Sequence, residues 1–112
     1  MEVVKASLLW DGPKRDIAIL FVEPTPQPWQ VDPDEELEIS VLRVLDENEE
    51  MTDAVAGIEI MDFLEFDEWH ALPKFSFLWQ LPGREPLPAD ELLRRMQQEL
   101  RVEARVLAQH AG

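Results

Sequence analysis

Cysteine is absent from this chain of 112 residues, which excludes a disulfide framework and any thiolate metal site. Histidine is scarce: His70 and His110 lie forty residues apart, and His70 is best interpreted as a surface residue beside Trp69. Zinc sites need histidine or cysteine at closer, recognisable spacing. The four glycines are isolated, so no phosphate-cradling loop is expected. We therefore expect no metal, no cofactor and no enzymatic activity.

Long apolar runs are also missing. The longest, such as residues 17–22, have about six residues, whereas a membrane span needs roughly 20. The first residues show no basic stretch followed by an apolar one, so no signal peptide is expected. Together with the lack of cysteine, this pattern predicts a soluble cytoplasmic protein that does not engage a membrane.

Basic residues are nearly absent from the middle of the chain. Residues 23–68 contain sixteen acidic residues and one base, Arg43, whereas residues 1–22 sum to zero and residues 69–112 to +1. The acidic runs that begin at Asp32 and Asp46 lack the glycine and the final glutamate of a calcium-binding loop. The net charge of −14 therefore bears on which partners the protein can bind and does not indicate a metal site.

A local field of one sign favours a basic protein as partner and disfavours direct binding of DNA or RNA. Six of the nine aromatic residues lie between Phe63 and Trp79, and the first three alternate with acids. We predict a partner-binding surface made of Asp46, Glu47, Glu49, Glu50, Asp62, Glu65, Phe66, Asp67, Glu68 and Trp69. The alternative is that the aromatic side chains belong to the core and the acids form a solvated rim around them. This alternative is the more common arrangement, because large aromatic side chains are usually buried.

The pattern predicts an α+β fold in a single domain, residues 1–112. Strands are expected at residues 2–10, 16–23, 36–45, 54–60 and 74–81, with residues 16–23 buried on both faces of the sheet. The proline-rich residues 24–33 are expected to form an extended loop, because proline lacks an amide donor. Asp62 and Glu65 have the spacing of a capping box, which predicts a short helix over residues 63–72. A longer helix is expected near residues 88–109, so we predict an antiparallel sheet of four or five strands, built of hairpins, packed by one long C-terminal helix.

Two short motifs, residues 16–20 (DIAIL) and residues 55–60 (VAGIEI), resemble strands of a family of small uncharacterised bacterial β-meander proteins. Asp16-Ile17-Ala18-Ile19-Leu20 is similar to an early strand of that family. Val55-Ala56-Gly57-Ile58-Glu59-Ile60, which follows an acidic turn, is similar to its V-x-G-I-E-I strand. The resemblance covers residues 8–61 and implies a β-meander core, with no catalytic residue to carry over.

The leading functional hypothesis is a small acidic protein-binding module of the inhibitor, antitoxin, immunity or adaptor type, with nucleic-acid mimicry as a special case. One alternative is an assembly subunit that forms a homodimer through its C-terminal helix. Another is a small-ligand or enzymatic domain with a pocket near Trp29. Salt dependence of binding separates the first hypothesis from the other two.

Overall fold

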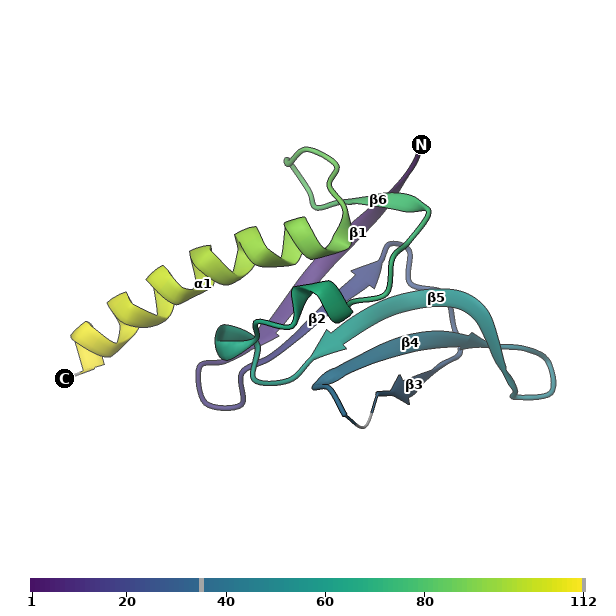
Figure 1. Cartoon of the computed structure of the whole chain (residues 1–112), viewed down its shortest axis with the longest axis horizontal. Coiled ribbons are helices and arrows are strands. Elements are labelled where there is room, and N and C mark those ends of the chain that lie inside the picture. The colour runs from purple at the N-terminus through teal and green to yellow at the C-terminus, as the bar shows by residue number, and fades with distance from the viewer. Residues whose placement is uncertain (35, 112) are drawn as a thin grey trace.

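Alternating and continuous apolar runs form a six-stranded sheet in the computed structural model of the chain, with strand order β3-β4-β5-β2-β1-β6. The structure describes residues 1–34 and 36–111, and side chains as far as residue 106; the side chain of His110 lies outside this part. The strands are β1 (Glu2–Asp11), β2 (Ile17–Val22), β3 (Trp29–Pro33), β4 (Ile39–Leu45), β5 (Met51–Ile60) and β6 (Phe77–Gln80). One long helix, α1 (Ala89–Ala111), follows them (Figure 1). The predicted α+β class is confirmed, with six strands in place of four or five.

The central strand β2 is buried on one face only. Ala18 and Leu20 are buried, whereas Ile17, Ile19 and Phe21 on the opposite face are half-buried. Their alternation follows from the two-residue period of a strand. The prediction of burial on both faces was wrong, because α1 lies on one side of the sheet and no second helix covers the other in the described part of the chain.

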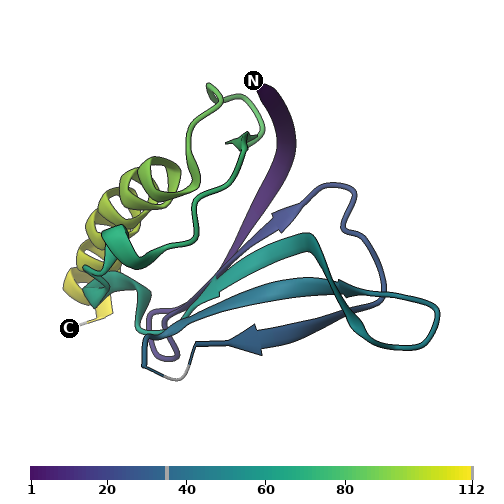
Figure 2. The same cartoon turned by 45° about the vertical axis from the view of Figure 1, so that its right-hand side comes forward.

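The sheet forks where β2 ends. β2 pairs with β1 over residues 6–11 and with β5 over residues 57–60. Beyond this stretch, β1 continues with β6 alone and β5 continues with β4 alone. Figure 2 shows the two branches diverging, one formed by β1 and β6 next to α1 and the other by β3, β4 and β5.

Strand β3 lies within the segment that we expected to be a loop. It forms one edge of the sheet and pairs with β4, with Pro33 opposite Ser40. The amide of Asp34 donates to the carbonyl of Ile39 at 3.0 Å, and alternate residues of an antiparallel strand face the partner. The nitrogen of Pro33 therefore points away from β4. An edge strand tolerates proline at such a position because no ladder hydrogen bond is lost.

The expected helix over residues 63–72 is two single turns of 3₁₀ helix, η1 (Phe63–Glu65) and η2 (Trp69–Ala71). The residue before η1, Asp62, has a left-handed backbone with φ of 50° and makes no side-chain capping bond, so the capping-box interpretation was wrong. Side chains of helix α1 hold this segment through its carbonyls. The amide nitrogen of buried Gln97 donates to the carbonyls of Phe63 and Phe66 at 2.7 Å each, and Arg101 donates to the carbonyl of Leu64 at 2.8 Å.

Asp16 joins the β1–β2 hairpin to η1. One carboxylate oxygen accepts a bond from the Trp10 indole at 2.9 Å, and the other accepts from the backbone amide of Leu64, also at 2.9 Å. Its carbonyl accepts from the amide of Phe63. Asp16 has φ of 53°, a left-handed conformation that aspartate tolerates better than most residues.

The last strand, β6, runs parallel to β1, whereas every other pair in the sheet is antiparallel. The helix follows it after the loop over residues 81–88, and the fully buried side chain of Trp79 packs in the core with Leu92 and Leu93. As predicted, Phe75 and Phe77 pack against the same core. Among the described residues, no helix combines the length and the apolar character that a membrane crossing requires.

Candidate protein-interaction surface

The first run of predicted site residues forms the turn between β4 and β5. One carboxylate oxygen of Asp46 accepts bonds from the backbone amides of Asn48 and Glu50, at 2.8 and 3.0 Å. Asp46 therefore shapes the turn. Glu47, Glu49 and Glu50 are exposed, and their carboxylates are not needed for this geometry. We call these four acids the tip cluster.

The second run surrounds the 3₁₀ turns. Asp62, Glu65 and Asp67 are exposed, and Glu68 is half-buried with its carboxylate 3.5 Å from the ring of His70. A hydrogen bond with Asp62, together with partial desolvation and the Asp62 charge, raises the pKa of the Glu38 carboxyl above its ordinary value. Glu38 thus adds a fifth acid to this group, which we call the base cluster: Glu38, Asp62, Glu65, Asp67 and Glu68.

The structure does not bring the tip and base clusters together. They lie at opposite ends of β5, whose ten residues span about 30 Å at the usual rise per residue. This separation exceeds the Debye length of ~8 Å at physiological ionic strength several times over. The predicted surface is therefore two separate acidic sites.

Phe66 is not a surface contact. Its side chain is only 6% exposed and belongs to the core beneath α1. The prediction of Phe66 as a partner-binding residue was wrong, because the turn at η1 points this ring inward while the neighbouring acids face solvent. Trp69 is half-buried, with its ring edge-to-face against Phe66 at 4.8 Å between centroids. The Trp69 ring therefore takes part in packing within the protein.

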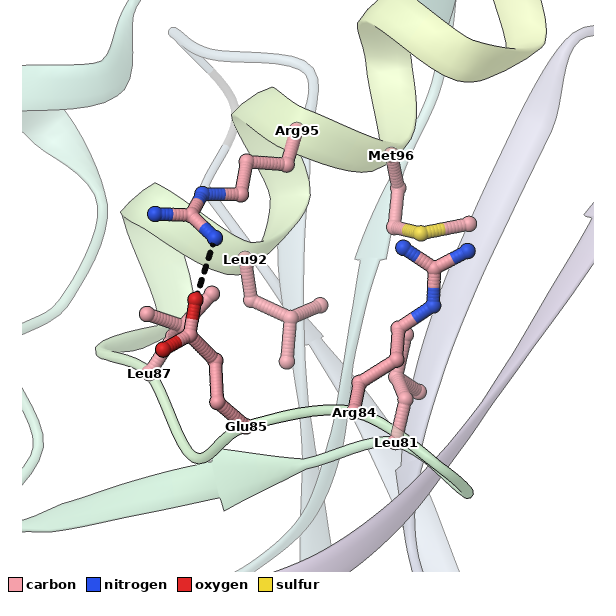
Figure 3. A pocket seen from close by; sticks show the side chains of 7 residues that line it. All are labelled: Leu81, Arg84, Glu85, Leu87, Leu92, Arg95 and Met96. Atoms are coloured by element: carbon pink, nitrogen blue, oxygen red, sulfur yellow. Dashed lines mark hydrogen bonds and ion pairs between the residues drawn. The ribbon is translucent and has the colours of Figure 1, made fainter.

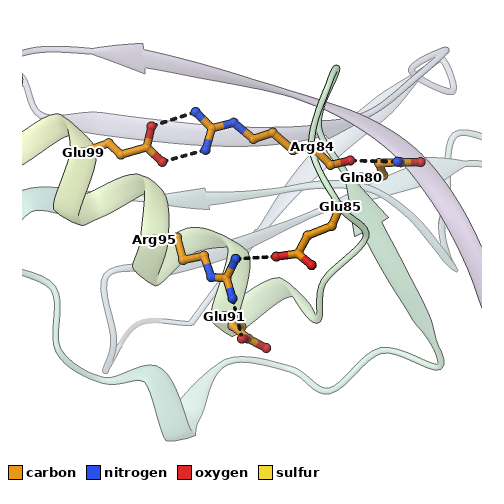
Figure 4. Close-up of polar contacts among 6 residues, drawn as sticks. All are labelled: Gln80, Arg84, Glu85, Glu91, Arg95 and Glu99. Carbon is orange, nitrogen blue, oxygen red and sulfur yellow. Dashed lines mark hydrogen bonds and ion pairs between the residues drawn. The ribbon is translucent and has the colours of Figure 1, made fainter.

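The acids of the sheet and of the helix differ in their pairing. Among the described acids of residues 23–68, only Asp32 and Glu68 lie within 4.0 Å of a base. Near the helix, Arg84 binds Glu99 through two bonds of 2.6 and 2.7 Å, and Arg95 binds Glu85 and Glu91 (Figure 4). The bond from Arg84 lowers the pKa of Glu99. The negative field of the sheet is therefore left largely uncompensated within the chain.

The Arg–Glu pairs close over a hollow of about 340 Å³ between α1 and the loop before it (Figure 3). Its apolar wall consists of Leu81, Leu87, Leu92 and Met96. The two arginines at the hollow already bind glutamates, so neither is available as an anchor for an anion. The hollow is explained by the ion pairs that fasten the loop to the helix.

A second hollow, of about 300 Å³, lies on the β3–β4–β5 branch beside the segment that leads to β6. Its apolar lining includes Val41, Val55, Phe75 and Phe77. Arg43, also at this site, is held by the Asp32 carboxylate at 3.1 Å and by the Asp53 carbonyl at 3.4 Å. The sequence does not predict this site, because its residues come from two strands and from the segment before β6, whose contacts cannot be read from a local pattern.

Two further expectations concern ligands. Trp29 lines neither of these hollows and packs against Phe21, with 6.2 Å between ring centroids. Within the described residues, no three histidine or acidic side chains come together in a way that could hold a metal ion.

No family model, curated protein or solved structure matches this chain. The resemblance of residues 8–61 to a bacterial β-meander family stays a prediction, and function has to be argued from the geometry.

Proposed function

We propose that this protein is a cytoplasmic acidic binding module that engages a basic surface of a partner protein, as an inhibitor, immunity protein or adaptor does. The observation that carries the proposal is the unequal pairing of its charges. Three acids near α1, Glu85, Glu91 and Glu99, are used in ion pairs with Arg84 and Arg95, whereas the tip and base clusters have almost no basic neighbours in the described chain.

Uncompensated surface charge of one sign accelerates association with an oppositely charged partner and repels like-charged surfaces. The exposed carboxylates of Glu47, Glu49 and Glu50 suit this role, since the turn does not depend on them. The same field opposes direct binding of nucleic acid. Imitation of nucleic acid remains a special case of the proposal, in which DNA would compete with the protein for its partner.

The experiment starts with an extract of the native cell, from which this protein, immobilised, retains its partners at low salt and releases them at high salt. With a purified partner, the association rate should fall as salt rises, whereas the dissociation rate should change little. The triple change Glu47→Gln, Glu49→Gln and Glu50→Gln should lower the association rate several-fold without altering the melting temperature.

A matched control removes three exposed acids far from the sheet tip: Glu2→Gln, Asp90→Asn and Glu103→Gln. It changes the net charge by the same amount, so a larger effect of the tip triple shows that position matters. If the association rate with the partner changes neither with salt nor in the tip triple variant, the charge serves solubility alone and the proposal is refuted.

A further inference from the structure

Strand β5 has an open edge over residues 51–56. On one side these residues face β4, but on the other side β2 has already ended, since its last pair with β5 is Phe21 opposite Gly57. In the described chain no other backbone segment pairs with this edge. Met51 is 47% exposed, and Asp53 and Ala54 are also exposed. The Ala54 amide donates to the Thr52 hydroxyl at 3.2 Å, the Asp53 carbonyl accepts from Arg43, and the register with β4 shifts on either side of Arg43. The other outward amides and carbonyls of such an edge can receive another strand.

The open edge borders the hollow of about 300 Å³ described above. Val55 belongs both to the edge and to the lining of the hollow. A strand added along β5 would direct every second side chain toward this side of the sheet. The hollow would then receive apolar side chains, and Phe75 and Phe77 would form its far wall.

Charge decides which strand the edge accepts. The tip cluster places four acids at one end of the open edge, and none of the four lies within 4.0 Å of a base. A fifth acid, Asp53, lines the hollow itself. The bases at the hollow are Arg43, which Asp32 already holds, and Lys74 at its outer wall. A second copy of the chain would bring the same acids against this edge, and like charges placed opposite one another are unfavourable.

We propose that an extended segment of the partner, with alternating basic and apolar residues, adds to the open edge of β5 as a further strand. Its backbone pairs with residues 51–56, its apolar side chains enter the hollow, and its basic side chains, on the other face of the strand, meet the tip cluster. Strand addition of this kind takes affinity from backbone hydrogen bonds and specificity from alternate side chains. This inference rests on the proposed function and names the partner chemistry at one of its sites.

The test uses a fluorescent eight-residue peptide of alternating lysine and valine as the probe. In an extended strand, all valine amides point to one edge and all lysine amides to the other. Two methylated peptides, one carrying N-methyl groups on the valines and one on the lysines, therefore block opposite edges at identical charge. One of the two should bind at least tenfold more weakly than the parent, and the other should bind within about threefold of it.

The protein is varied in parallel. Glu47→Gln, Glu49→Gln and Glu50→Gln together should weaken the parent peptide at least tenfold, whereas the control triple at Glu2, Asp90 and Glu103 should weaken it less than threefold. Amide resonances of residues 51–56 should shift on titration. Salt-dependent binding of the parent peptide that is unaffected by either methylation overturns strand addition but leaves the proposed function intact.

Two other results would overturn the inference. Equal loss of binding for both methylated peptides would show that no defined edge is used. A dimer in sedimentation equilibrium, with residues 51–56 protected from amide exchange, would assign the edge to a second copy. A parent peptide that does not bind even at low salt contradicts strand addition, and the proposed function then depends on the partner experiment alone.

Discussion

Gln97 is the polar side chain on which the arrangement of the base cluster depends. It is 2% exposed, and its amide nitrogen is the donor for two backbone carbonyls of the segment that carries Glu65. We expect Gln97→Met to preserve helix propensity and approximate shape while removing both bonds. The Phe63 carbonyl keeps a bond from the amide of Phe66 at 3.2 Å, but the Phe66 carbonyl loses its donor.

The cost follows from these two carbonyls. Losing one of two bonds at Phe63 costs about 0.5–1.5 kcal/mol, and leaving the buried Phe66 carbonyl unsatisfied costs about 1–3 kcal/mol. We therefore expect Gln97→Met to lower the free energy of unfolding by about 2–4 kcal/mol. At about 4 °C per kcal/mol for a chain of this size, the melting temperature should fall by roughly 8–16 °C.

Urea denaturation and thermal melting measure this change, and the neighbouring Gln98→Met is the matched control. Gln98 is exposed, so its replacement should change stability by less than about 0.5 kcal/mol. Equal stability of the two variants would refute the reasoning, because it would mean that the carbonyls of Phe63 and Phe66 do not depend on Gln97.

Gln97→Glu adds a test with a sign. A buried carboxyl that faces two carbonyls has a folded-state pKa above its unfolded value of about 4.3, because burial disfavours the charged form. Such a variant should be closest to the wild type below that value and should lose stability as pH rises through the folded pKa. Urea denaturation at a series of pH values checks this, and a pH-independent difference from the wild type would contradict it.

Two further predictions concern other polar contacts. Asp16→Ala removes the acceptor for Trp10 and Leu64, so it should destabilise the protein by about 2–4 kcal/mol in urea denaturation, and Asp16→Asn should cost less because one acceptor oxygen and a tolerated left-handed backbone remain. The carboxyl resonance of Glu38 should titrate with a pKa above the ordinary glutamate value of about 4.3, and Asp62→Asn should return the pKa toward that value. Because the pKa of Glu38 is raised in the folded state, the stability that the shared proton contributes is fully present below the ordinary pKa. This stability is lost as pH rises through the folded-state pKa. A Glu38 titration that is unchanged by Asp62→Asn would contradict the contact.

Much of the fold could be predicted from pattern, because strands and the amphipathic helix depend on local periodicity. Strand β3 was missed because proline was treated as incompatible with any ladder, whereas the nitrogen of Pro33 points away from its partner strand. The parallel placement of β6 beside β1 depends on tertiary packing, which no local pattern records. The extended backbone of Phe66 ends η1 and divides the expected helix into two 3₁₀ turns.

The candidate site was predicted in part. Exposure of Glu47, Glu49 and Glu50 follows from a charged turn, and the structure agrees. The separation of the two clusters could not be read from the sequence, because a strand of ten residues carries neighbours in the chain far apart in space. Burial of Phe66 agrees with the alternative stated from the sequence, in which the aromatic side chains are core. The buried hydrogen bonds of Gln97 could have been predicted from the sequence. Gln97 lies between Leu93 and Leu100 on the apolar face of the helix, and a polar side chain that is buried there needs a hydrogen-bond partner.

The fork in the sheet divides one strand between two environments of different stability. Ile58 and Ile60 lie in the part of β5 that is hydrogen-bonded on both sides, whereas Asp53 and Ala54 lie where only β4 supports the strand. Local opening costs least where few buried contacts and backbone bonds are lost. Amide exchange should therefore change from slow to fast within a few residues of a single strand, and the outer branch can fray or become ordered while the core under α1 keeps its packing.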